Sequence, residues 1–205
     1  MARTRDPSID ARILAAAIDI YAAEGWAAFT FESVARCAAV GKPGVYRRFA
    51  SREELLTAAL TELSWPAADD HGSLRDDLEH WSAAMMRWWS TPAGAAFLRW
   101  QTDLRFVPAL TSGYPAVMGS RLDSVNGILH RAVERGELSS DDDHTPLLEM
   151  VSGAVLTRVL AAPWSRPSAA TSQAYAADVV TRAVLAEGLP PGRPITRSRV
   201  RRGLR

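Results

Sequence analysis

The sequence has little cysteine, little lysine and no long apolar run, and each shortage excludes a class of protein. Cys37 is the single cysteine among 205 residues, so the chain can form no internal disulfide and no cysteine-rich metal site. It has no run of 18 apolar residues and no basic, apolar, cleavable N-terminus, which predicts a cytoplasmic protein without a membrane span. Lys42 is the single lysine among 24 basic residues.

The sequence also lacks the short motifs of common enzyme classes. It has no glycine-rich P-loop, no Gly-x-Gly-x-x-Gly after a strand, no His-Glu-x-x-His and no Gly-x-Ser-x-Gly. The four histidines are scattered, and His80 and His130 fall within expected helices, where a surface histidine is more common than a metal ligand. We therefore predict no catalytic residues, no metal site and no cofactor.

Residues 30 to 52 predict two short helices joined by a tight turn. Thr30 suits the N-cap of the first helix, over residues 31–38, because its hydroxyl can accept hydrogen bonds from free backbone N–H groups. Pro43 suits the first turn of the second helix, over residues 42–49, where its missing N–H is no loss. Two short helices around such a turn are typical of a helix-turn-helix.

The same stretch is strongly basic, although the chain's net charge is only +1. From Arg36 to Arg52 there are five basic residues and no carboxylate. Because Val45 and Phe49 are four residues apart and apolar, they should face inward and turn the polar side chains of the second helix outward. The outward side chains are Lys42, Tyr46, Arg47 and Arg48. A solvated basic helix is the structural alternative, but the pattern favours a surface that faces nucleic-acid phosphates.

Residues 8 to 60 resemble the N-terminal region of the TetR family of bacterial transcriptional regulators. The segment AAVGKPGVYRRF, residues 38–49, resembles the family's turn and recognition helix, and SREELL, residues 51–56, resembles the start of its fourth helix. The resemblance implies two sets of DNA contacts. Those to phosphates would come from Thr30, Lys42, Tyr46, Arg48 and Arg52, and those to bases from Pro43, Gly44 and Arg47.

Three positions depart from the family pattern. Ala39 replaces the usual turn glycine, Gly44 replaces a threonine or alanine, and Arg48 replaces a histidine. An alanine held at positive φ costs about 1 kcal/mol relative to glycine, so the turn should differ slightly from the family's. Gly44 removes a side chain that could touch a thymine methyl, so the bases that are read should also differ.

The rest of the chain predicts helices and no strand. A first helix, capped by Ser8 or Asp10 and stopped by Gly25, should pack behind the helix pair. Further helices are expected over residues 51–64, 73–90, from Pro92 onward, 116–135, 145–162 and 169–187. Prolines and glycine at residues 108–115 predict a loop.

The second half contains bulky apolar side chains on consecutive expected helices. Such side chains suit an apolar or aromatic ligand, although a stripe of large apolar residues is core by default. The resemblance favours the ligand site, because C-terminal domains of the TetR family usually hold a small molecule. The candidate effector-binding residues are Trp81, Met85, Trp88, Trp89, Trp100 and Phe106.

A homodimer is expected on two grounds. One recognition helix contacts too few base pairs for a specific site, whereas two helices related by a twofold axis would read a palindromic operator in double-stranded DNA. The family resemblance also implies dimerisation through the last two helices. Small residues beside branched ones make the helices at about 146–162 and 169–187 the best candidates for this interface.

The predicted fold class is all-α, with two domains and a tail. Residues 1–62 form an N-terminal three-helix helix-turn-helix domain, and residues 63–189 form a helical ligand-binding and dimerisation domain. Residues 190–205 form a basic tail rich in proline and arginine, expected to be disordered. The predicted function is a repressor released from DNA by a small effector. Two alternatives are a constitutive DNA-binding protein and a partner-binding module or enzyme with an accessory helix-turn-helix.

Overall fold

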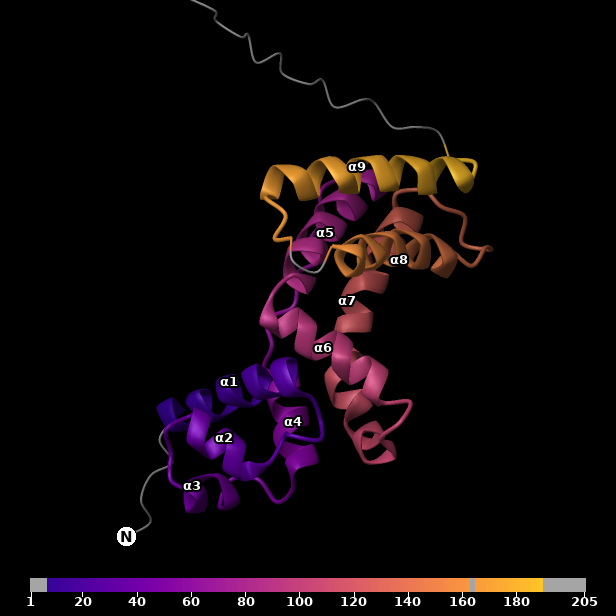
Figure 1. The fold of residues 1–205 in the computed structure, drawn as a ribbon. Helices are drawn as coiled ribbons and strands as arrows, with labels where there is room; N and C mark the ends of the chain where they lie inside the picture. Colours follow the sequence, from indigo (N-terminus) through magenta and orange to yellow (C-terminus); the bar gives the residue numbers. More distant parts are fainter. Residues whose placement is uncertain (1–6, 163–164, 190–205) are drawn as a thin grey trace, which may run out of the picture.

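The computed structural model describes residues 7–162 and 165–189 of the chain, and this part is all-α. Figure 1 shows the helices in two groups, with the first four at one end and the last two at the other. Within the described residues there are nine α-helices, one short 3₁₀ helix and no strand. The predicted all-α class is therefore confirmed. The tail at residues 190–205 lies outside the described residues.

The first four helices lie close to their predicted positions. They are α1 (Pro7–Glu24), α2 (Phe31–Cys37), α3 (Lys42–Tyr46) and α4 (Arg52–Thr61). The expectation that Ser8 or Asp10 caps α1 is wrong, because α1 already begins at Pro7 and both residues lie within its first turn. A proline at the start of a helix loses nothing there, since its absent N–H would have no helical partner.

The second half contains five more α-helices and the 3₁₀ helix. They are α5 (Leu74–Trp89), α6 (Pro92–Asp103), η1 (Pro108–Gly113), α7 (Tyr114–Glu134), α8 (Thr145–Ala161) and α9 (Ala169–Ala186). The loop predicted over residues 108–115 is thus replaced by η1 and the first turn of α7. Proline is tolerated in the first turn of a short helix, so Pro108 and Pro115 permit helix here instead of preventing it.

Hydroxyl side chains fix where most helices begin. In each case the N-cap oxygen accepts a hydrogen bond from the backbone N–H three residues later, which satisfies a donor that the helix itself leaves free. The N-cap residues that do this are Thr30, Ser51, Ser73, Thr91 and Ser168. The N-cap role that the sequence predicts for Thr30 is confirmed.

Buried apolar side chains form two hydrophobic cores. The first core joins α1–α4 and also takes in Phe97 and Trp100 from α6, Leu110 from η1 and Val117 from α7. The second core joins α5, the C-terminal half of α7, α8 and α9. Packing of the first core therefore continues past residue 62, where the sequence predicted a domain boundary.

A buried hydrogen bond joins α1 to α6. The hydroxyl of Tyr21, a fully buried side chain, donates to the Asp103 carboxylate over 2.7 Å. Burial, followed by this hydrogen bond, raises the pKa of Tyr21 far above its ordinary value. One turn further, Gly25 has a φ of +76°, and a Cβ there would lie 2.3 Å from the Arg99 guanidinium. The end of α1 and the body of α6 are therefore in close contact.

A buried arginine joins α7 to the end of α4. Arg121 is 5% exposed and donates to the carbonyl oxygens of Leu60, at 2.6 Å, and Leu63, at 3.4 Å. Its guanidinium also lies 5.4 Å from the Trp65 ring and 5.6 Å from the Phe97 ring. Among the described residues it has no carboxylate partner, and burial lowers its pKa. The negative end of the α4 helix dipole stands in for a counter-ion.

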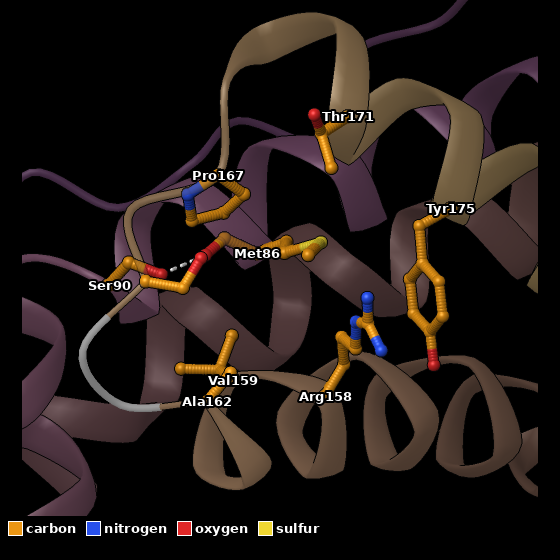
Figure 2. Close-up of a pocket in the computed structure, with 9 residues that line it drawn as sticks. Met86, Ser90, Arg158, Val159, Ala162, Pro167, Thr171 and Tyr175 are labelled. Atoms are coloured by element: carbon orange, nitrogen blue, oxygen red, sulfur yellow. Dashed lines mark hydrogen bonds between the residues drawn. The ribbon is translucent and has the colours of Figure 1, made fainter.

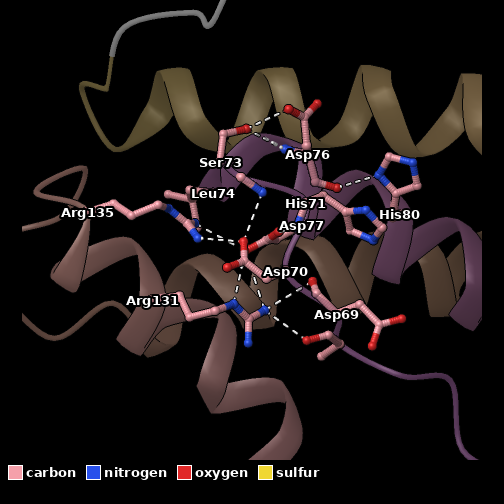
Figure 3. Close-up of polar contacts among 12 residues, drawn as sticks. Asp69, Asp70, His71, Ser73, Leu74, Asp76, Asp77, His80, Arg131 and Arg135 are labelled. Atoms are coloured by element: carbon pink, nitrogen blue, oxygen red, sulfur yellow. Dashed lines mark hydrogen bonds and ion pairs between the residues drawn. The ribbon is translucent and has the colours of Figure 1, made fainter.

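A polar cluster joins the start of α5 to the end of α7 (Figure 3). Asp77 is 1% exposed, and its carboxylate accepts from Arg131 at 3.4 Å and Arg135 at 3.1 Å. The Glu137 carboxylate accepts from the backbone N–H of Leu74 over 2.8 Å. A buried carboxylate needs such partners, because an unpaired buried charge is costly. These contacts hold the start of α5 against the end of α7, and both helices enclose the second core.

Candidate nucleic-acid interface and ligand cavity

The turn between α2 and α3 is a Schellman motif with alanine at its left-handed position. The backbone N–H of Ala39 donates to Arg36 O over 3.2 Å, and that of Val40 donates to Ala35 O over 3.0 Å. Ala39 has a φ of +51°, the one positive value among the described non-glycine residues. Ala39 therefore adopts the left-handed conformation that glycine usually occupies in this motif.

Arg12 of α1 holds this turn from behind. Its guanidinium donates to Ala38 O over 2.5 Å and to Ala39 O over 2.7 Å. These carbonyls lie at the C-terminal end of α2, where helix geometry leaves acceptors unsatisfied and a cation is favoured. Sequence reasoning missed Arg12, because a lone arginine on a long helix carries no signal of the carbonyl it will meet.

Helix α3 presents three polar side chains to solvent. Val45 is fully buried, as predicted, whereas Lys42, Tyr46 and Arg47 are exposed. The Arg47 side chain has no hydrogen-bond or ion-pair partner among the described residues. Arg47 is the C-cap residue of α3, and its unpaired, exposed guanidinium is free to bind an acceptor on another molecule.

Arg48 does not face outward as the sequence predicted. Its guanidinium forms an ion pair with Asp10 of α1 and donates to Gly44 O over 2.9 Å. The side chain is only 12% exposed. The reason is geometric: α3 ends at Tyr46, so Arg48 lies beyond the helix and turns back toward α1. Arg48 therefore anchors α3 and contributes little to the exposed basic surface.

Glu32 brings a carboxylate to the basic face. It accepts from the Tyr46 hydroxyl over 2.9 Å and lies 3.7 Å from the Lys42 ammonium. A backbone N–H at the start of α2, followed by Tyr46, lowers the pKa of Glu32, and the same bond raises the pKa of Tyr46. The carboxylate is thus charged at neutral pH and orients both side chains. It escaped the sequence reading because it precedes the basic stretch.

The other predicted DNA-contacting residues differ in how exposed they are and in what they contact. Thr30 is half-buried, and its hydroxyl caps α2 by accepting from Ser33 N over 3.1 Å. The Arg52 guanidinium lies 4.0 Å from the centre of the Trp26 ring, although 39% of its side chain remains exposed. Pro43 is exposed, and a Cβ on Gly44 would have nothing nearer than 4.0 Å.

The predicted effector-binding residues are not gathered into one site. Trp81, Met85 and Trp89 are buried in the second core, whereas Trp100 is buried in the first. Trp88 is half-buried and packs against both cores. The remaining member, Phe106, is 76% exposed at the end of α6. Periodicity identified the apolar faces of α5 and α6 but not what covers each face.

A cavity of about 70 Å³ lies instead between the C-terminal ends of α5 and α8 and the start of α9. Figure 2 shows its side chains converging from these three helices. The Arg158 guanidinium lies 5.4 Å from the centre of the Tyr175 ring. The lining residues are Met86, Ser90, Arg158, Val159, Ala162, Ser165, Pro167, Thr171 and Tyr175. Sequence reasoning missed this cavity, because helix ends from three separate segments form it.

Comparison with known proteins gives matches over both halves of the chain. Residues 13–59 match the family described as bacterial regulatory proteins, tetR family, and residues 68–183 match the tetracyclin repressor-like C-terminal domain. The chain is 29% identical to the HTH-type transcriptional regulator AqdR of Rhodococcus erythropolis over 75% of each protein. It is also 29% identical to the uncharacterized HTH-type regulator Mb1581 of Mycobacterium bovis, over 87% of this chain and 91% of the relative.

A solved structure shares the fold. The fatty acid degradation regulator FadR from Bacillus halodurans superposes with a TM-score of 0.63 at 15% identity, over 89% of this chain and 97% of that one. At this identity the likeness concerns the fold alone. Among the described helices, none combines the length and apolar character needed to cross a membrane.

Proposed function

Because the chain belongs to the TetR family of bacterial regulatory proteins, we propose that it is a sequence-specific transcriptional repressor that a small effector releases from its operator. The observation that carries this proposal is the exposed face of α3, where Lys42, Tyr46 and Arg47 project into solvent. A short helix with exposed cations suits the major groove of double-stranded DNA. Such a regulator acts on the chromosome, and therefore in the cytoplasm.

The contacts divide into those that position the protein and those that read sequence. We assign Lys42, Tyr46, Arg52 and the Thr30 region to phosphates, and Arg47 with the Pro43–Gly44 backbone to base edges. Arg48 is reassigned from phosphate binding to holding α3 against α1. Glu32 favours a fixed orientation of the polar side chains before DNA arrives, which lowers the entropy lost on binding.

The effector is proposed to be a small molecule with an apolar or aromatic body that enters between α5, α8 and α9, where the present cavity of about 70 Å³ must widen to admit it. Met86, Val159 and Tyr175 supply apolar and aromatic surface, and Arg158 supplies a cation that would pair with a polar or anionic group. Of the tryptophans proposed from sequence, Trp81 and Trp89 are buried in the second core and Trp100 in the first, so none of these three lines the cavity. Their burial also favours the rival view, a constitutive DNA-binding protein.

The proposed homodimer uses α8 and α9. On α8 the residues Met150, Gly153, Thr157 and Leu160 recur at three- and four-residue intervals and are all exposed. Met150 is 41% and Leu160 is 61% exposed, which leaves an apolar stripe facing solvent. A glycine in such a stripe permits the close helix approach of a four-helix bundle. Two protomers would then present two α3 helices to a palindromic operator.

The test begins by selecting the preferred duplex from a random library and then measuring affinity for it and for a scrambled duplex over a salt series. Arg47→Ala should relax preference at one base position, at a loss of about 1 to 3 kcal/mol on the selected site. Lys42→Ala should weaken both duplexes alike and lower the salt slope by about 1. Arg87→Ala, an exposed arginine on α5, is the matched control. Failure of the parent protein to enrich any sequence would refute the proposal.

A further inference from the structure

A second, larger hollow lies between α1, the end of α4 and the start of α6. Its volume is about 430 Å³, which falls in the range of small-molecule sites. One wall is a single face of α1, because the residues that line it recur at intervals of three and four. They are Ala11, Leu14, Ala15, Ile18 and Asp19.

The opposite wall comes from α4 and from the first turn of α6. Helix α4 contributes Ala59, the two residues just after its end contribute Glu62 and Leu63, and α6 contributes Pro92 and Ala93. Alanine side chains are too short to fill the space between helices whose separation is set by larger neighbours. The small residues on all three helices therefore leave a groove with aliphatic walls.

Two carboxylates give this groove a negative charge. Asp19 and Glu62 are the charged members of the lining, and both are exposed. Neither has a cationic partner among the described residues, whereas the carboxylates of Asp10 and Glu32 nearby are paired with arginine or lysine. Like charges on opposite walls of a groove repel each other, and a cation between them removes that repulsion.

We propose that this groove binds an amphipathic organic cation, with an aliphatic body against the alanine and leucine side chains and an ammonium group between Asp19 and Glu62. The size of the groove limits the ligand to drug-like dimensions, and its charge disfavours anions. This site lies on other helices than the α5–α8–α9 cavity and selects the opposite charge from the one Arg158 would select.

Occupancy of the groove has a consequence for DNA binding, and this part rests on the proposed function. Helices α1 and α4 carry the α2–α3 pair. Helix α6 is joined to α1 by the Tyr21–Asp103 hydrogen bond, and its Leu98 packs against the second core. A ligand bound between α1, α4 and α6 favours the distance between these helices that fits it best. If the spacing of these helices differs between the DNA-bound and the DNA-free protein, the cation changes the affinity for the operator by the factor by which its own affinity differs between those two states.

The test compares three ligands that share the adamantyl body and differ in charge. Binding of 1-adamantylamine, 1-adamantanol and 1-adamantanecarboxylate to the full chain is measured by titration calorimetry without DNA, so the result does not depend on the operator. The amine should bind, the alcohol should bind about tenfold more weakly, and the carboxylate should not bind. Equal affinity for the amine and the alcohol would overturn the role of the carboxylates.

Variants then locate the site. Asp19→Asn and Glu62→Gln should each lower the affinity for the amine by about fivefold, as expected for exposed charge pairs. Ala15→Leu, an exposed position, should fill the groove and abolish binding. The matched controls are Glu24→Gln and Ala23→Leu, which are exposed on α1 outside the groove.

Each outcome decides the proposal. Loss of binding in Ala15→Leu together with normal binding in Ala23→Leu supports the groove as the site. Unchanged affinity in Ala15→Leu, or an equal loss in the Glu24→Gln control, overturns it. If the amine binds as expected but leaves operator affinity unchanged, the site stands and its regulatory role fails. If DNA binding is absent altogether while the amine binds, the proposed function fails and the site remains.

Discussion

At the scale of single residues, the methyl group of Ala39 has a larger effect than its size suggests. The Ala39 backbone has a left-handed conformation, which is unfavourable for any residue with a Cβ, and Ala39 lies in the turn that orients α3. Three hydrogen bonds from Arg12 to two carbonyl oxygens and the two backbone bonds of the Schellman motif oppose this strain. The turn therefore depends on α1 more than a glycine turn would.

Replacing Ala39 with glycine should stabilise the protein by about 1 kcal/mol, because the strain of the Cβ disappears while the hydrogen bonds remain. The measurement is the free energy of unfolding from urea titration followed by circular dichroism. Ala15→Gly, in the regular helix α1, is the matched control and should destabilise by about 1 kcal/mol. Equal losses in both variants would show that the positive φ carries no strain.

At the scale of helices, α6 connects the DNA-facing helices to the rest of the molecule. Tyr21→Phe removes one oxygen atom and with it the bond to Asp103, leaving a half-buried carboxylate with one donor fewer. We expect a loss of about 1 to 3 kcal/mol in unfolding free energy, as for other hydrogen bonds to charged groups. Tyr114→Phe, whose tyrosine is 41% exposed, is the control and should be neutral. A neutral Tyr21→Phe would mean that the α1–α6 contact is held by apolar packing alone.

Helix positions could be predicted from the sequence because their causes are local. A hydroxyl three residues before a free N–H, a proline in a first turn and a glycine after a last turn each act within one helical turn. Contacts between helices lack such local causes. The turning of Arg48 toward Asp10 and the approach of Glu32 to Tyr46 depend on the crossing angle of helices that the sequence does not encode locally. For the same reason the tryptophans could be identified as apolar but not assigned to one core or the other.

At the scale of the whole molecule, the exposed stripe on α8 tests the proposed dimer. A Cβ on Gly153 would meet no atom within 4 Å, so a larger side chain fits the monomer. Gly153→Arg should therefore keep the helical circular-dichroism spectrum, sediment as a monomer and bind the selected duplex at least tenfold more weakly. Gly119→Arg places the same side chain on α7, where a Cβ also meets no atom, and should remain dimeric. A dimeric Gly153→Arg protein would place the interface elsewhere.

The extension of the first core into α6 and α7 sets an order of events during synthesis of the chain. Helices α1–α4 leave the ribosome first, yet Phe97, Trp100 and Val117 fill the core between them and α7. Arg121 then reaches the end of α4, about 60 residues after Thr61. At typical elongation rates this interval lasts about 3 to 12 seconds. The nascent chain thus completes the core beneath its DNA-facing helices only after α5, α6 and the first half of α7 have been made.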